Sequence, residues 1–129
     1  MIYVIDTHSL IWFLTGDKNL GKNALKILED ADKGVHIIII PTIVLAELMY
    51  ICENKGINMK FIDILNKLKN SLNYIPYNLD INLIIKASTL NKIKEIHDRL
   101  IIAITQLTDA KLITKDKLIK NTSYVECVW

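Results

Sequence analysis

Short β-branched apolar runs alternate with longer helix-like segments along the whole chain, and this alternation is the feature that most constrains the fold. Five runs have strand character: residues 2–5, 36–40, 74–77, 111–114 and 124–128. The 36–40 run is apolar on both faces, which is typical of a strand buried within a parallel sheet. Strands that alternate with helices predict an α/β fold, with a parallel sheet covered by helices on both faces.

Seven segments between or after these strands have helical spacing or helix-capping signals. They cover residues 9–14, 22–33, 42–54, 59–72, 80–93, 98–108 and 116–120. Gly16 and Gly34 follow two of these segments and are natural helix stops, and Asp80 is a favoured N-cap. The 98–108 segment is apolar almost all round, so we expect it to be the central helix.

The composition predicts one folded domain spanning residues 1–129. Hydrophobic residues make up 51% of the chain, which is enough to bury a core, and the net charge of +2 is too small to argue for nucleic-acid binding by itself. The two cysteines have no zinc-like spacing, which favours a reducing environment. The apolar run around residues 35–40 is far too short to span a membrane. We therefore expect a soluble, cytoplasmic protein.

Four acidic residues fall where the expected topology brings them toward the carboxyl edge of the sheet. Asp6 directly follows the first strand, and Asp116 comes two residues after the fourth. Glu47 lies about two turns into the helix after the second strand, and Asp98 opens the central helix. Ligands of parallel α/β sheets bind outside this edge. If the first strand lies between the second and the fourth, the four carboxylates approach one another.

Clustered carboxylates repel one another, and desolvation makes their ionised forms costlier still. Two charges ~4 Å apart interact by roughly 4 kcal/mol at an intermediate effective dielectric. A divalent cation relieves this repulsion, and hard oxygen ligands without cysteine or paired histidine favour Mg²⁺ or Mn²⁺. Such an ion can orient a water molecule, lower its pKa and stabilise the leaving oxygen of a phosphodiester.

Each acid also has a structural interpretation. Asp6, Asp98 and Asp116 all precede or begin helices, where aspartate is a favoured cap. Glu47 is harder to explain in this way, because it lies among apolar residues on a helix that we expect to be mostly buried. An acid in such a place needs a charged partner or a metal ion.

Four segments of the chain form a recognisable set: the opening Tyr-Val-Ile-Asp-Thr-His-Ser-Leu-Ile-Trp-Phe-Leu, the Leu-Ala-Glu-Leu around Glu47, His-Asp-Arg-Leu-Ile-Ile-Ala around Asp98, and the late Leu-Ile-Thr-Lys-Asp ending at Asp116. Together they resemble a PIN domain, and more narrowly the VapC-type toxins of toxin–antitoxin pairs. The resemblance covers the whole chain. It implies a PIN-like three-layer sandwich in which a five-stranded parallel sheet has the order 3-2-1-4-5.

The resemblance also implies roles for individual residues. Asp6, Glu47 and Asp98 correspond to the core acids and Asp116 to a fourth, which together hold Mg²⁺ or Mn²⁺ and catalyse hydrolysis of RNA. The hydroxyl of Thr114 would support this network, although a hydrogen bond at the strand end is the alternative. Two further residues are assigned supporting roles. They are Arg99, which would brace an active-site carboxylate, and Thr7, which can also be a simple helix-start residue.

Proteins of this kind are usually inhibited by a cognate antitoxin and tend to be homodimers. Trp12, Phe13 and Tyr50 are candidates for an apolar antitoxin-binding surface, and burial in the core is the alternative for each. Three other residues near the acids have open roles. Glu95 competes with Asp98 for the third acidic position, while His8 and His97 either contact phosphate and transfer protons or serve in packing and capping.

Three other functions fit parts of the pattern. A phosphatase of the haloacid-dehalogenase kind would use Asp6 as its nucleophile, but it needs a second acid at position 8, which is histidine. A phospho-acceptor receiver domain needs an acidic pair near the first strand and an aspartate after the third, and neither is clear. A PIN-like scaffold without catalysis would be expected to lack one of the four acids, and none is missing.

Overall fold

The computed structural model describes residues 1–129 and contains a single parallel sheet of five strands. The strands are β1 (Ile2–Ile5), β2 (Ile37–Pro41), β3 (Tyr74–Tyr77), β4 (Lys111–Ile113) and β5 (Cys127–Val128). Their order is β3-β2-β1-β4-β5, and every neighbouring pair is parallel. The predicted α/β class and the predicted strand order are therefore confirmed.

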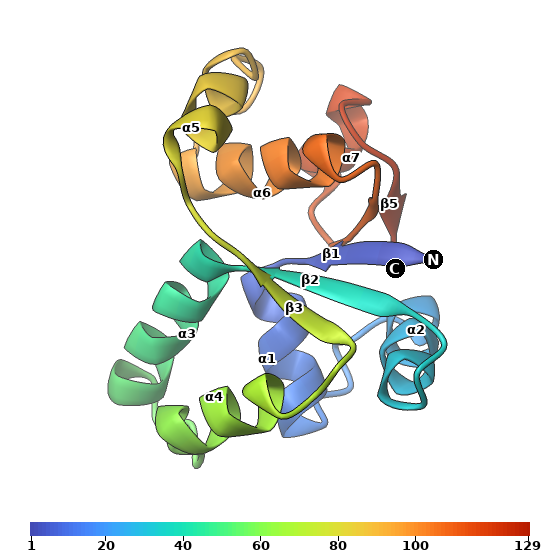
Figure 1. The fold of residues 1–129 in the computed structure, drawn as a ribbon, viewed down its shortest axis with the longest axis vertical. Helices are drawn as coiled ribbons and strands as arrows, with labels where there is room; N and C mark the ends of the chain where they lie inside the picture. Colours follow the sequence, from blue (N-terminus) through green and yellow to red (C-terminus); the bar gives the residue numbers. More distant parts are fainter.

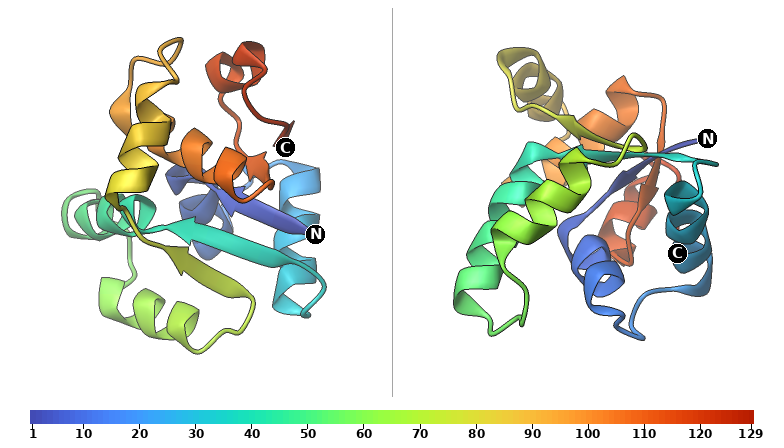
Figure 2. Two further views of the ribbon diagram at one scale, coloured as in Figure 1. Left: turned by 45° about the horizontal axis from the view of Figure 1, so that its top comes forward. Right: turned by 60° about the horizontal axis from the view of Figure 1, so that its bottom comes forward.

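Seven helices connect the strands and cover both faces of the sheet (Figure 1). They are α1 (Thr7–Thr15), α2 (Lys22–Asp32), α3 (Thr42–Asn54), α4 (Phe61–Lys69), α5 (Ile81–Ser88), α6 (Ile96–Leu107) and α7 (Lys117–Thr122). Helices α1 to α4 lie on one side, and α5 to α7 lie on the other, which gives three layers (Figures 1 and 2). None of the helices has both the length and the hydropathy that a membrane span requires.

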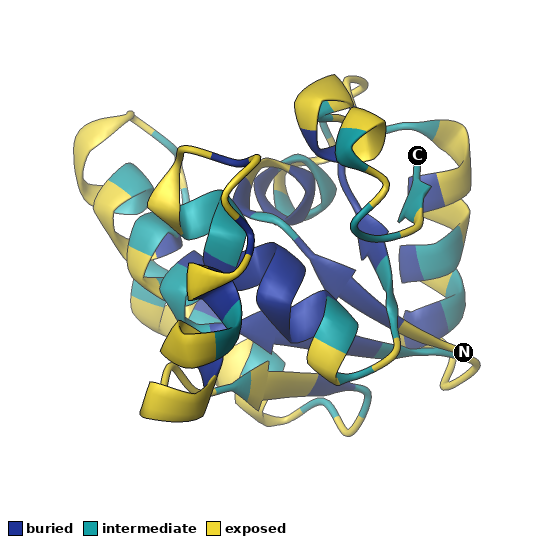
Figure 3. Ribbon diagram, turned by 90° about the horizontal axis from the view of Figure 1, so that it is seen from above, coloured by how far each residue is buried: buried dark blue, intermediate teal, exposed yellow.

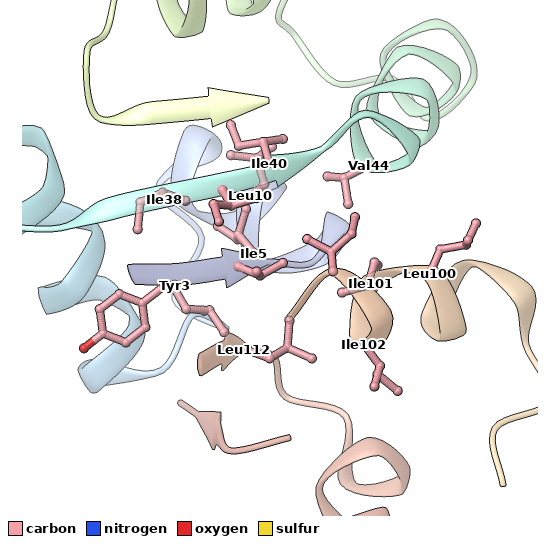
Figure 4. Close-up of a cluster of buried hydrophobic side chains, with 14 of the residues drawn as sticks. Tyr3, Ile5, Leu10, Ile38, Ile40, Val44, Leu100, Ile101, Ile102 and Leu112 are labelled. Atoms are coloured by element: carbon pink, nitrogen blue, oxygen red, sulfur yellow. The ribbon is translucent and has the colours of Figure 1, made fainter. Parts of the chain in front are cut away.

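The core lies between the central strands and the helices that pack on them. It contains 28 buried hydrophobic residues, and the middle of β1, β2 and β4 contributes several side chains without any exposed surface. Helix α6 is buried over six consecutive residues, 100–105, as its all-round apolar sequence predicts. Figure 3 shows buried residues along the sheet and the adjoining helices, and Figure 4 shows Ile101 and Ile102 of α6 near Ile5 and Leu112.

Several predicted boundaries are wrong by a few residues. The helix predicted over 59–72 ends at Lys69, and Leu72, expected on its apolar face, is 93% exposed. The helix predicted over 80–93 ends at Ser88, where the Ser88 and Thr89 hydroxyls donate to backbone carbonyls of the last turn. Such side-chain bonds compete with continuation of a helix. Strand β5 is only two residues long, because only Leu112 and Ile113 of the short strand β4 pair with it.

Helix caps set the start of the elements that matter for the site. Asp6 caps α1, Asp80 caps α5 and Asp116 caps α7, each through its side chain and a backbone N–H of the first turn. Gly16 ends α1 in the left-handed conformation, with φ of 67°, which glycine adopts without steric cost. Helix α6 differs from prediction, because its cap is Glu95 and Asp98 lies within its first turn.

Candidate active site

The carboxyl ends of β1 and β4 bring Asp6 and Thr114 side by side. Strand β1 lies between β2 and β4, and the Asp6 N–H donates to the Ile113 carbonyl at 3.3 Å. The hydroxyl of Thr114, which is buried, donates to Oδ2 of Asp6. The backbone N–H of Ser9 donates to Oδ1 of the same carboxylate at 2.9 Å. Both oxygens of Asp6 are thus oriented by neighbours at the edge of the sheet.

Glu47 reaches the same edge from α3, which begins directly after β2. Thr7 is the first residue of α1 and is buried, and its hydroxyl donates to Oε1 of Glu47 at 3.0 Å. Nδ1 of His97 lies 3.6 Å from Oε2 of Glu47. The Glu47 side chain is 31% exposed, so α3 is less buried than predicted, but the carboxylate has the polar partners that its surroundings require.

The N-terminus of α6 adds two further acids. Glu95 accepts a hydrogen bond from the backbone N–H of Asp98 at 2.8 Å, which is the capping interaction of this helix. His97 lies between two carboxylates, because its Nδ1 is 3.5 Å from Oε1 of Glu95 in addition to its contact with Glu47. This histidine therefore links α6 to α3 across the site.

A cavity of about 360 Å³ is lined by these side chains, which come from the start of α1, from α3, from the start of α6 and from the loop after β4. Its lining residues are Asp6, Thr7, His8, Ser9, Trp12, Glu47, Glu95, His97, Asp98, Ile101, Lys115 and Asp116. All four acids that the sequence singles out therefore face one concave space, as predicted from the strand order. Thr114 does not line the cavity, but its hydroxyl is hydrogen-bonded to Asp6, which does.

The electrostatics of Asp98 show how close the acids are to one another. Its pKa is raised from 3.8 to about 6, first because the carboxyl is partly buried and then because other carboxylates repel its charge. In decreasing order, these carboxylates belong to Glu95, Asp116, Asp6 and Glu47. A single carboxyl group thus experiences the field of four others, which lie far apart in the sequence.

The chemistry of the donor set fits a hard divalent cation. The cavity offers five carboxylates against two imidazoles, those of His8 and His97, and no sulfur, which favours Mg²⁺ or Mn²⁺ over zinc. No three His, Cys, Asp or Glu side chains are close enough together to hold a metal ion as they stand. The residues therefore suit such an ion in type and location, and binding requires the carboxylates to draw closer around it.

One expectation from the sequence differs from the structure. Arg99 does not brace a carboxylate: its Nε donates to the Ile93 carbonyl, and it takes part in none of the ion pairs. The reason is helical geometry, because the residue after Asp98 lies about 100° further round α6. The three aromatic candidates for an antitoxin-binding surface have different surroundings. Trp12 lines the acidic cavity, Phe13 lines a separate cavity of about 130 Å³, and Tyr50 is 59% exposed on α3.

Some residues of the site were left open or unassigned by the sequence. Glu95 is both a helix cap and a wall of the cavity, so it accompanies Asp98 rather than replacing it. The signal was the Glu-x-x-Asp spacing, since a cap accepts a hydrogen bond from the residue three positions on. The Ser9 N–H has the same capping relation to Asp6, whereas Lys115 had no signal, because its role depends on where the loop after β4 meets α1.

Comparison with known proteins gives a consistent result. The sequence profile of the PIN domain family matches residues 3–123. A search among curated protein sequences found no match. Among solved structures, VapBC2 from Rickettsia felis, bound to a promoter DNA fragment, gives a TM-score of 0.75 at 19% identity and covers 99% of this chain and 98% of that one.

Two further structures have the same fold over almost their whole length. A toxin–antitoxin complex from Klebsiella pneumoniae gives a TM-score of 0.72 at 18% identity, covering 98% of this chain and 96% of that one. FitAcB from Neisseria gonorrhoeae gives a TM-score of 0.61 at 17% identity, covering 100% and 97%. At these identities the similarity establishes a common fold.

Proposed function

The chain belongs to the PIN domain family, and on that premise we propose that it is a metal-dependent ribonuclease and the toxin of a toxin–antitoxin pair. Residues 1–129 act as one catalytic domain, and the substrate is an RNA phosphodiester in the cytoplasm. One observation carries the proposal. Asp6, Glu47, Asp98 and Asp116, which are distant in the sequence, line the same cavity at the carboxyl edge of the sheet.

In this proposal, the four acids hold Mg²⁺ or Mn²⁺. When bound, the ion supplies positive charge that activates a water molecule and offsets the charge developing on the phosphodiester. The other residues keep the acids in position. Thr114 and the Ser9 N–H fix the two oxygens of Asp6, and Thr7 fixes one oxygen of Glu47. The raised pKa of Asp98 is consistent with this role, because a carboxyl crowded by other carboxylates gains most from a cation.

An antitoxin partner is supported by the similar folds, which include a toxin–antitoxin complex and VapBC2. A homodimer is supported by an exposed apolar face on α5. Ile81, Ile84 and Ile85 are 74%, 52% and 60% exposed, and side chains of this size gathered on one helix usually mark a protein–protein contact.

The alternative functions have less support. A phosphatase of the haloacid-dehalogenase kind needs an acid at position 8, but His8 occupies it and packs against Trp12, with ring centroids 5.7 Å apart. A scaffold without catalysis would bind the metal or RNA without cleaving RNA. No observation favours it, because each of the four acids is present and faces the cavity.

The test is cleavage of single-stranded RNA by the purified protein, with Mg²⁺ or Mn²⁺ and with EDTA. We expect the wild type to cleave only with the metal. We expect Asp6→Asn to lose at least ~100-fold in rate while circular dichroism shows an unchanged fold. Glu29→Gln is the matched control, since Glu29 is an exposed acid on α2 and lies outside the cavity. Cleavage by folded Asp6→Asn at the wild-type rate would refute the proposal.

A further inference from the structure

A second cavity, of about 550 Å³, adjoins the acidic one and has different chemistry. The two cavities share Lys115 and Asp116, so they are neighbours at the loop after β4. Helix α2 contributes Asn23 and Ile27 to the second cavity, and the rest comes from α7, β5 and the adjoining loops. This space therefore leads away from the acids, between α2 and α7.

Both tryptophans of the chain lie where the two cavities meet. The rings of Trp12 and Trp129 contact each other edge to face, with centroids 5.8 Å apart and an angle of 69°. Trp12 also packs against His8. Nζ of Lys115 lies 5.7 Å from the centroid of the Trp12 ring. The two indoles remain partly exposed. A partly exposed aromatic cluster of this kind can accept a stacked base.

Close packing fixes the position of Trp129. A Cβ atom on Gly21 would lie 2.6 Å from Cδ1 of Trp129 and 2.7 Å from its backbone carbon. Only glycine therefore permits the indole to rest against the start of α2. The backbone of Gly21 is not in a left-handed conformation, with φ of −64°, so the close approach is the reason for glycine here. The indole is thus held in place before any ligand arrives.

Three lysines line the second cavity: Lys115, Lys117 and Lys120. All three are exposed, and none is in an ion pair with a carboxylate. The three lysines are unpaired although Asp116 and the acidic cavity lie close to them. Unpaired lysines that follow a groove are suited to contact successive phosphates of a nucleic-acid strand.

We propose that the Trp–Lys groove, formed by Trp12, Trp129, Lys115, Lys117 and Lys120, holds the single-stranded RNA that flanks the scissile phosphodiester. Bases stack on the two indoles, while the lysines contact the backbone. The inference rests on the proposed ribonuclease function and assigns the groove as its substrate-binding path. The strand is single because base faces are available for stacking on side chains only when they are unpaired.

The two tryptophans provide a direct probe, because the chain has no others. The Asp6→Asn variant, with Mg²⁺ present, is titrated with a single-stranded RNA oligonucleotide of mixed sequence. We expect intrinsic tryptophan fluorescence to be quenched as the oligonucleotide binds, and we expect the same sequence as a duplex to cause much less quenching. Binding is measured in parallel by fluorescence anisotropy of a labelled oligonucleotide.

Variants locate the binding path. Replacing Lys115, Lys117 and Lys120 together by alanine removes three phosphate contacts, so the slope of log K against log salt should fall by about 2. The matched control replaces three exposed lysines that line neither cavity, Lys33, Lys55 and Lys60, and should leave the slope almost unchanged.

Trp129→Ala tests the stacking platform separately from the charges. It should weaken binding at least about 5-fold, the lower end of the range for one stacked base. Trp129→Phe, which keeps an aromatic face, should restore most of the affinity. The fold of each variant is checked by circular dichroism.

The outcomes separate this inference from the proposed function. If the wild type cleaves RNA but the lysine and tryptophan variants bind it as well as the control does, the groove is not the path and the ribonuclease proposal survives. If single-stranded RNA binds without quenching, the stacking role is refuted. If the wild type does not cleave RNA yet binds it with quenching through these residues, the groove stands and the proposed function fails. Quenching by an acidic peptide but not by RNA would instead make the groove a protein-binding site.

Discussion

Replacing Asp98 by asparagine should stabilise the metal-free protein at neutral pH. The ionised carboxyl is destabilised in the fold by burial and by four neighbouring carboxylates, which raise its pKa to about 6 from 3.8. No hydrogen bond depends on its side chain, because the bond to Glu95 uses the backbone N–H of Asp98. Asparagine therefore removes the repelled charge and keeps nearly the same size and shape.

The magnitude follows from the change in pKa. The difference between 3.8 and about 6 corresponds to roughly 3 kcal/mol at pH values where the carboxyl is ionised in both states. Because the side chain is partly exposed, water screens much of this energy, and we expect about 1 kcal/mol.

The pH dependence has a definite sign. A raised pKa means that the folded state binds more protons than the unfolded state between these two values, so the stability of the wild type falls as pH rises through this window. Below about pH 4 the carboxyl is protonated in both states, and the advantage of Asp98→Asn should disappear.

Urea unfolding followed by circular dichroism, in EDTA and at a series of pH values, measures the effect. Glu29→Gln, an exposed acid outside the cavity, should change the free energy of unfolding by less than about 0.5 kcal/mol. An Asp98→Asn variant that is no more stable than the wild type at pH 7, or whose advantage persists at pH 3.5, would refute the reasoning.

Three other changes test separate parts of the structure. Thr114→Val leaves a carboxylate oxygen of Asp6 without its donor and should cost about 1–3 kcal/mol in urea unfolding, while Thr114→Ser should recover most of that loss. Gly21→Ala should cost about 1–3 kcal/mol and shift the fluorescence of Trp129, because the new methyl group clashes with the indole; an unchanged spectrum and stability would contradict that packing. Ile84→Glu on α5 should convert a dimer to a monomer of 14.8 kDa by light scattering, and a wild type that is already monomeric would exclude the α5 contact.

The sequence predicted the fold well because its strongest signals are local. Two-sided apolar strands and an all-round apolar helix identify a parallel sheet and its central helix, and the structure agrees for β2 and α6. Helix ends were less predictable. Leu72 continues the apolar spacing of α4, yet the chain has already turned away at Asn70, so a periodic pattern alone did not mark the boundary.

The four acids of the site were predicted from the strand order and from the helices that follow the strands. Asp6 and Asp116 follow strands, so topology alone brings them to one edge. Contacts between elements were out of reach, because they depend on the packing of helices. The hydrogen bond from Thr7 to Glu47 and the position of His97 between two carboxylates are of this kind. The same limit applies to Arg99, whose direction is set by its place on α6.

Isothermal titration of the metal-free protein with Mn²⁺ tests the central claim most directly. The claim is that the carboxylates of Asp6, Glu47, Asp98 and Asp116 act together on one divalent ion. We expect saturable binding by the wild type and by the control Glu29→Gln, and loss of most of the affinity in Glu47→Gln with the fold intact. Absence of Mn²⁺ binding to the folded wild type, or equal binding by Glu47→Gln, would contradict it.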